Sequence, residues 1–473
     1  MAGGGFSAAP AAGSRAAEYE GKITFYVIIT CIIAASGGLM FGYDVGISGG
    51  VTSMDDFLAK FFPEVLRNKE TSATTGDSYC QYDNQNLQLF TSSLYLAALI
   101  ATFFASIVTR KYGRKVTMLV AGVFFDVGVV LNAAAQDLPM LIIGRILLGC
   151  GVGFANQGVP LFLSEIAPTH LRGALNILFQ LNVTIGILFA NLVNYGTLRI
   201  RPWGWRLSLA IAGVPALCLT LGSLVLVETP NSLVERGHLE KAKVVLKKIR
   251  GTDNINAEFE DLVEASHIAQ QVKHPFRNLI QRRNWPQLVI TCALQIFQQF
   301  TGINAIMFYA PVLFQTLGFK NDASLYSAVI TGAVNVLSTL VGVYSVDKVG
   351  RRVLLLEACV QMFLSQVAIG ILLGVGLKSG GSELSHGTAI VVVLMAFLSM
   401  LCTFKYGIFL FFAAWVVVMG IFTLLFIPET KNIPIEEMGV VWKQHWFWKR
   451  IVPSSDYPEA GTDNGLELKP VPI

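Results

Sequence analysis

Charged residues are scarce in this sequence, and their scarcity excludes a soluble globular protein. Asp, Glu, Lys and Arg together make up 14% of the 473 residues, whereas 53% of the residues are hydrophobic. The mean hydropathy is +0.57. Soluble domains carry about 25% charged residues. The net charge of +4 is small and lies in loops, which excludes nucleic acid as the expected partner.

Cysteines are also few, and groups of residues typical of catalytic sites are not evident. Five of the seven cysteines lie in or near apolar runs, where they behave as small hydrophobic residues. The sequence contains no evident metal-ligand cluster, phosphate-binding loop or nucleophile–base set, because its glycine clusters fall inside apolar runs. We therefore expect neither an enzyme nor a bound metal or other cofactor.

Long apolar runs are what the sequence does contain. A helix needs roughly 20 apolar residues to cross a bilayer. Only helices and closed barrels satisfy their backbone groups in lipid, so these runs predict an all-α polytopic membrane protein. The first run lacks a cleavage pattern and is interpreted as a spanning helix, not a removed signal peptide. The predicted spans are Ile23–Ser48, Leu89–Val108, Val116–Ala135, Leu138–Val159, Ala174–Val193, Leu207–Val227, Leu288–Leu313, Ser324–Val346, Val353–Val375, Thr388–Phe404 and Ile408–Ile427.

A basic turn occurs twice, as Thr109–Lys115 and as Asp347–Arg352, each time between two apolar runs. This repeat indicates a duplicated protein with two helical bundles. Residues 228–286 alternate basic and acidic side chains, which predicts short amphipathic helices joining the bundles. Two repeats about a long central loop are typical of secondary transporters.

Lys and Arg concentrate in alternate loops, which by the positive-inside rule face the cytoplasm. The predicted organisation is a cytoplasmic tail 1–22, a six-helix bundle 23–227 with an extracellular lid loop 49–88, cytoplasmic linker helices 228–286, an incomplete bundle 287–430 and a cytoplasmic tail 431–473.

The number of residues that follow each copy of the turn allows the lengths of the two halves to be compared. Glu228 lies 115 positions after Gly113, whereas Glu429 lies only 79 positions after Gly350, so the second half is 36 residues shorter. Only three apolar runs fit into it, which leaves about 11 apparent spans. Either Thr388–Phe404 crosses the membrane and the final tail lies outside, or the tail stays inside and this short run enters and returns on one side or lies at the surface.

Five motifs occur in order along the chain: Gly37–Val51, Gly144–Gly149, Ser164–Gly173, Gln298–Asn304 and Pro428–Lys431. Together they resemble the sugar-porter branch of the major facilitator superfamily, and most closely the plant hexose–proton symporters called sugar transport proteins. The resemblance covers about Lys22 to Arg450, with an apparent internal deletion near residue 395. It implies two bundles that import a monosaccharide with protons at the plasma membrane, in a chain we expect to be a monomer. The alternatives are a non-transporting paralogue or splice form, and a proton-independent uniporter.

Asp44 lies inside an apolar run, where a carboxylate costs about 2.5–3.5 kcal/mol on insertion scales. Arg145 in the fourth span is its natural partner, because a buried charge needs an opposite one. A static ion pair is one interpretation. The other is a proton switch, in which Asp44 takes a proton when it separates from Arg145, and the family resemblance implies this role.

Neutral side chains that form hydrogen bonds make up a second group of candidate site residues. Amides both donate and accept, as sugar hydroxyls do, and an aromatic ring covers the apolar face of a sugar. Amide pairing between helices is the alternative. The predicted sugar-binding residues are Phe41, Gln180, Gln298, Gln299, Asn304 and Asn335.

The resemblance implies two further features. A disulfide between Cys80 and Cys402 is implied if both lie outside. The basic turns signal topology and, by resemblance, also act as cytoplasmic latches that pair with acidic residues. The implied latch residues are Arg114, Glu165, Arg172, Glu228, Asp347 and Arg351.

Overall fold

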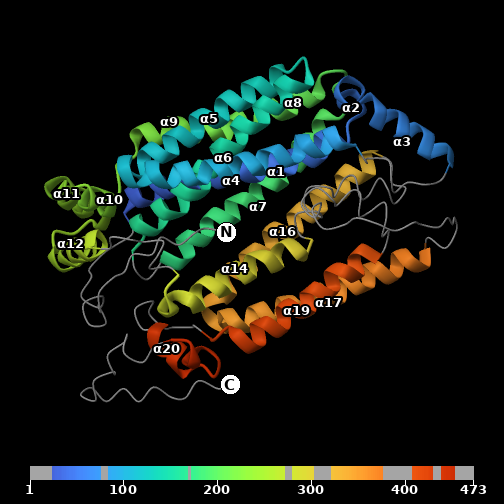
Figure 1. The fold of residues 1–473 in the computed structure, drawn as a ribbon. Coiled ribbons are helices and arrows are strands. Elements are labelled where there is room, and N and C mark those ends of the chain that lie inside the picture. Colours follow the sequence, from blue (N-terminus) through green and yellow to red (C-terminus); the bar gives the residue numbers. More distant parts are fainter. Residues whose placement is uncertain are drawn as a thin grey trace.

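The computed structural model describes residues 24–75, 84–168, 172–271, 280–302, 321–376, 407–429 and 438–452. Within these ranges the chain forms helices and no strand. Seven of the described helical stretches are long and apolar enough to cross a membrane. The chain is therefore a polytopic helical membrane protein, and the predicted fold class is confirmed. Figure 1 shows the long helices running side by side in two groups, blue to green and yellow to red.

The first half contains the long helices that the apolar runs predict. The span predicted at Leu207–Val227 is instead two helices that meet at Ala212. Pro215 explains the break, because it has no N–H to donate to the carbonyl of Ile211. The helices are α1 (Phe25–Thr52), α4 (Gln85–Tyr112), α5 (Arg114–Ala134), α6 (Leu138–Ile166), α7 (Arg172–Thr197), α8 (Gly204–Ile211) and α9 (Gly213–Val225).

Short helices occupy both connecting regions of the first half. Within the lid loop 49–88, the chain forms α2 (Asp55–Phe61) and α3 (Pro63–Thr75), which the sequence analysis treats only as a loop. Phe57 of α2 is buried against Phe90 and Trp205, so the lid packs on the bundle. The linker forms α10 (Pro230–Glu235), α11 (Leu239–Arg250) and α12 (Asn256–Gln271), as its alternating charges predict.

The second half consists of α14 (Trp285–Phe300), α16 (Asn321–Val349), α17 (Arg351–Gly376), α19 (Gly407–Phe426), α20 (Met438–Gln444) and two 3-10 turns, η3 (Arg282–Asn284) and η5 (Trp448–Arg450). The predicted span Leu288–Leu313 stops being helical at Phe300, before Gly302 with φ +74°. Residues 303–320 and the predicted run Thr388–Phe404 lie outside the described residues.

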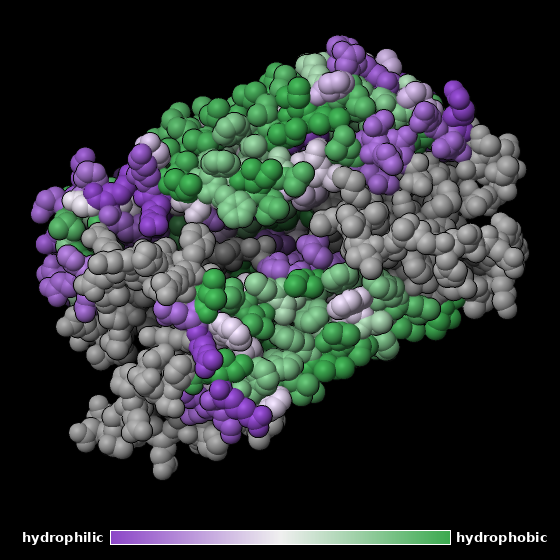
Figure 2. Space-filling model, in the orientation of Figure 1, coloured by the Kyte–Doolittle hydropathy of each residue, from purple (hydrophilic) through white to green (hydrophobic). Residues whose placement is uncertain are grey.

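The two halves differ in the size of their buried cores. In the first half a continuous apolar core joins α1, α4, α5, α6, α7 and the lid helices. Among the described residues of the second half, the bundle core contains Phe297, Cys359, Val416 and Met419. Figure 2 shows apolar side chains over the outer faces of both groups of helices, as expected for surfaces that contact lipid.

The contacts between helices fix their directions. The hydroxyl of Thr24, at the start of α1, donates to the carbonyl of Ile249 in α11 at 3.1 Å. The linker helices therefore mark one end of the molecule, and α2 and α3 mark the other (Figure 1). Helices α7 and α16 run antiparallel, because Asn191 donates to the carbonyl of Ala328 at 3.2 Å while Leu188 packs on Gly332.

These directions bear on the two topologies for the shortened half. The carboxylate of Glu429, after α19, accepts the backbone N–H of Arg351 and of Arg352, which begin α17, both at 3.2 Å. Helix α17 therefore leaves from the end of the molecule to which α19 returns. The described helices α17 and α19 therefore run in opposite directions, and the predicted run Thr388–Phe404 lies outside the described residues.

Candidate functional site

Close helix packing positions the buried charges. Gly42 of α1 lies against the backbone of Val183 in α7, where a Cβ atom would overlap the Val183 carbonyl. Gly149 of α6 lies against the carbonyl of Leu94 in α4 in the same way. Small residues let membrane helices approach closely, and Gly37 of α1 likewise lies against Val159 of α6. Asp44 and Arg145 each lie within five residues of these glycines, at the resulting contact.

Asp44 and Arg145 form a direct ion pair. The Nη1 atom of Arg145 lies 2.6 Å from Oδ1 of Asp44, and both residues are 1% exposed. The Nη2 atom of Arg145 donates to the hydroxyl of Ser48, which itself donates to the carbonyl of Asp44 at 2.7 Å. The guanidinium carbon lies 4.2 Å from the ring centre of Phe90 on α4. The Nε atom of Arg145 has no hydrogen-bond partner within the described part of the chain.

Ser48 and Phe90 extend this site beyond the predicted residues. Ser48 follows Asp44 by four positions, which places both side chains on one face of α1. That spacing is a signal by which the sequence indicates Ser48. The sequence carries no comparable signal for Phe90, because its contact depends on how α4 packs beside α6.

The predicted amides lie on three helices. Gln180 is on α7, Gln298 and Gln299 are on α14, and Asn335 is on α16. Among the described residues, the side chains of Gln180, Gln298 and Asn335 make no hydrogen bond, so the structure does not pair these amides across helices. Amides without a protein partner are available to a polar ligand.

Two predicted sugar-binding residues differ from these amides. Phe41 is half-buried on α1 and packs against the core of the first half. Asn304 lies outside the described residues. Figure 2 shows hydrophilic side chains gathered between the two apolar lobes, in the region that separates the two halves on this face.

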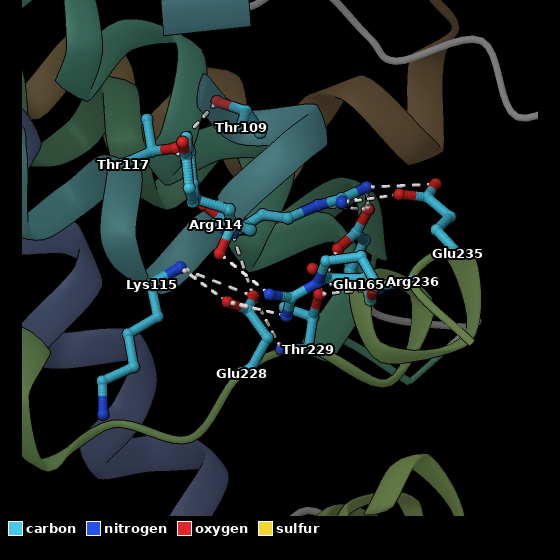
Figure 3. Close-up of polar contacts among 12 residues, drawn as sticks. Thr109, Arg114, Lys115, Thr117, Glu165, Glu228, Thr229, Glu235 and Arg236 are labelled. Carbon is cyan, nitrogen blue, oxygen red and sulfur yellow. Dashed lines mark hydrogen bonds and ion pairs between the residues drawn. The ribbon is translucent and has the colours of Figure 1, made fainter. Parts of the chain in front are cut away.

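The first basic turn forms a network of ion pairs at the linker end (Figure 3). Arg114 binds Glu165 of α6 through Nη2 and Glu235 of α10 through Nη1, each at 2.7 Å. The carboxylate of Glu228 accepts the backbone N–H of Arg114 at 2.9 Å and pairs with Arg236 at 3.4 Å. Arg114 and Glu165 are brought together as the latch requires, in contacts that lie within the first half and its linker.

Glu235 and Arg236 belong to this ion-pair network, although they are not among the predicted latch residues. Glu235 follows Glu228 by seven residues, and its carboxylate reaches Arg114 because Thr229 caps α10 through the N–H of Ser232 at 3.3 Å. The hydroxyl of Thr229 also donates to Glu165 at 2.6 Å. A polar segment after a predicted span is a weak signal for such contacts.

The second basic turn repeats the backbone part of this network. Gly113 and Gly350 have φ of 96° and 107°, and each lies against the carboxylate of its partner, Glu228 or Glu429. Arg351 is exposed, whereas Arg114 is buried. The sequence of the second half contains no counterpart of the Ser164–Gly173 segment that supplies Glu165.

Besides Asn304, four predicted site residues are outside what the structure describes in full. Cys80 and Cys402 lie in undescribed segments, so the implied disulfide stays a prediction. The side chains of Arg172 and Asp347 are likewise outside the described atoms. The five described cysteines are all free thiols.

The chain is similar to proteins named as sugar transport proteins. The sequence model of the family described as "Sugar (and other) transporter" matches residues 30–397 and 382–442. Sugar transport protein MST4 of Oryza sativa subsp. japonica is 64% identical over 98% of this chain and 100% of that protein. Sugar transport protein 13 of Arabidopsis thaliana is 64% identical over 96% of this chain and 95% of that protein.

Solved structures with the same fold include those of a bacterial symporter. The proton:xylose symporter XylE bound to 6-bromo-6-deoxy-D-glucose has a TM-score of 0.69 at 24% identity, covering 89% of this chain and 100% of that chain. The xylose transporter XylE from E. coli, in a partially occluded inward-open conformation, has a TM-score of 0.66 at 22% identity, covering 87% of this chain and 100% of that chain. These likenesses show the major facilitator fold.

The family match and the alignment with MST4 are consistent with the deletion predicted near residue 395. The family match breaks into two segments that overlap at residues 382–397. The alignment with MST4 has 519 positions, whereas 98% of the 473 residues is about 464 residues. About 55 aligned positions therefore have no residue in this chain, more than the 36 residues that separate its own two halves.

Proposed function

Because this chain belongs to the sugar transporter family of the major facilitator superfamily, we propose that it is a proton-coupled symporter that imports a monosaccharide by alternating access. The pair of Asp44 and Arg145 carries this proposal. Both side chains are buried within helices long enough to cross a membrane, where an ionisable residue is costly and marks a functional site.

The proton part of the mechanism rests on Asp44. With Arg145 at 2.6 Å, the carboxylate of Asp44 is held ionised. A shift of α1 relative to α6 that separates the two groups favours uptake of a proton by Asp44. Arg145 then keeps Ser48 and the ring of Phe90 as partners, so neutralisation of Asp44 does not leave the guanidinium without contacts.

The sugar part rests on the amides of both halves. Gln180 of the first half and Gln298 and Asn335 of the second half have amides without described partners, and hexose hydroxyls match their donors and acceptors. Gln299 and Asn304 belong to the same proposed site, and Phe41 supplies an aromatic face beside it. A ligand held from two halves is released when the halves rock apart, which is how repeat-based transporters alternate access.

We place the chain in the plasma membrane with its N-terminus in the cytoplasm, as a monomer surrounded by lipid. The start of α1 lies beside the linker helix α11, at the end of the molecule that also carries the basic turns. The positive-inside rule assigns that end to the cytoplasm. The final described residues, 438–452, lie near the same end in Figure 1, which supports a cytoplasmic C-terminal tail.

The missing positions favour a second candidate function, a sugar porter paralogue or splice form that no longer transports. About 55 positions of its relative MST4 have no counterpart here, and the described bundle core of the second half is small. Such a chain keeps the intact first half and its ion pair. A uniporter is the remaining alternative, with the pair of Asp44 and Arg145 as a static contact.

Uptake of radiolabelled glucose into yeast cells that lack their own hexose transporters distinguishes these candidates. The symporter proposal predicts saturable uptake that rises at acidic external pH and collapses when a protonophore removes the proton gradient. Normal surface abundance without uptake would identify the non-transporting form. Uptake that ignores the protonophore would identify a uniporter.

A further inference from the structure

A second carboxyl group lies at membrane depth and takes no part in the proposed transport site. Asp126 is the thirteenth residue of α5, about 18 Å along the helix from Arg114 and about 12 Å from Ala134 at 1.5 Å per residue. Its side chain meets Thr220 of α9, and Gly122 lets α9 approach because a Cβ atom there would meet the same threonine.

The hydrogen bonds of Thr220 are compatible with a neutral Asp126. The hydroxyl oxygen of Thr220 lies 2.8 Å from Oδ2 of Asp126 and 2.9 Å from the carbonyl of Ala216. A hydroxyl has one proton to donate, and both a carbonyl and an ionised carboxylate only accept. If Asp126 is a neutral acid, it donates to Thr220 and Thr220 donates to Ala216, so each of these two contacts has its own proton.

Neighbouring charges do not alter this assignment. Asp126 makes no ion pair among the described residues, and its Oδ1 atom is buried without a partner. The charged side chains on the helices packed against α5 are engaged elsewhere or lie at helix ends. Arg145 binds Asp44, Arg206 donates to the carbonyls of Ala133 and Ala135, and Tyr43 donates to the carbonyl of Ser208, while α9 carries only Cys218.

The contact between α5 and α9 that holds Asp126, called the seam below, borders the lipid-facing surface. Val123 and Val130 lie three positions before and four positions after Asp126 on the same face of α5, and they are 48% and 65% exposed. Leu217 and Leu224 flank Thr220 on α9 in the same way and are 51% and 55% exposed. Asp126 itself is partly exposed at this seam.

We propose that Asp126 is a neutral, proton-holding carboxylic acid between α5 and α9 that a lipid-soluble carbodiimide modifies from the membrane. In this reaction the acid proton moves to one nitrogen of the carbodiimide while the carboxyl oxygen bonds to its central carbon. The acyl group then migrates from oxygen to nitrogen, breaking the C–O bond and forming a C–N bond. The product retains all atoms of the reagent, and the reaction requires the undissociated acid.

The test treats the full chain in native membranes with dicyclohexylcarbodiimide and locates the added mass by peptide mass spectrometry. The expected result is modification of Asp126 and not of Asp44, which is ion-paired and 1% exposed. Modification of Asp126 is expected to stay nearly constant from about pH 6 to about pH 8, whereas an acid of ordinary pKa loses about tenfold of its neutral form per pH unit.

Two variants and a second reagent complete the test. Asp126→Asn keeps the shape of the side chain and is expected to remove the adduct while preserving abundance. Thr220→Val is expected to retain it, because the acid stays in the same apolar seam. An unmodified Asp126, a steep loss with rising pH, or modification only by a charged water-soluble carbodiimide would each overturn the proposal.

Discussion

Replacing the two members of the ion pair of Asp44 and Arg145 singly and together tests whether they act as one buried unit. Asp44→Asn leaves a guanidinium that is 1% exposed and that cannot lose its proton. Breaking a buried pair in this way costs about 3–5 kcal/mol. At about 2–4 °C per kcal/mol for a unit the size of the bundle 23–227, the melting temperature falls by about 10 °C.

Arg145→Gln is expected to cost less than Asp44→Asn, because the remaining Asp44 carboxyl can take a proton and become neutral. For the same reason, lowering the pH is expected to stabilise Arg145→Gln and to leave Asp44→Asn unchanged. The double variant carries no buried charge at this site and is expected to recover most of the loss, since neutral replacements of buried pairs are often tolerated.

The assay is the temperature at which half of the purified protein remains monodisperse in detergent, measured by fluorescence-detected gel filtration. Glu240→Gln on the exposed face of α11 is the matched control and is expected to behave as the wild type. If the losses of the two single variants simply add in the double variant, the two side chains do not act as a unit and the reasoning fails.

Three further predictions concern the latch, the sugar site and the helix contacts. Arg114→Gln is expected to cost about 2–3 kcal/mol by stranding the buried carboxylate of Glu165, and Arg351→Gln less because Arg351 is exposed, as compared by thermal unfolding; equal losses would contradict this. Gln298→Ala is expected to raise the KM for glucose about tenfold at unchanged surface abundance, equivalent to one lost hydrogen bond; an unchanged KM removes it from the site. Gly42→Ala is expected to reduce surface abundance by overpacking α1 on α7, whereas Gly196→Ala meets nothing within 4 Å and serves as the control.

Local patterns in the sequence predict much of the first half. The recurrence of the basic turn identifies a repeat, and the structure shows why Gly113 and Glu228 are meaningful markers of it, because the two residues are in contact. Asp44 indicates a charged partner because a lone carboxylate in lipid is costly. Arg145 follows as that partner, since it is the basic residue within a predicted span.

The features that the sequence does not reveal depend on tertiary contacts. The lid helices α2 and α3 form where Phe57 packs on the bundle, and their polar composition hides this contact. Asp126 falls inside an apolar run whose average hydropathy conceals one acid. The relative direction of α17 and α19 follows from the contact of Glu429, after α19, with the start of α17.

The movement of protons with sugar tests the central claim most directly. Glucose is added to a lightly buffered suspension of cells that express the chain, and the external pH is recorded. Symport predicts that the medium becomes more alkaline because protons enter with the sugar, and that Asp44→Asn abolishes this change at equal surface abundance. No alkalinisation by the wild-type chain, or the same alkalinisation by Asp44→Asn, would contradict the account.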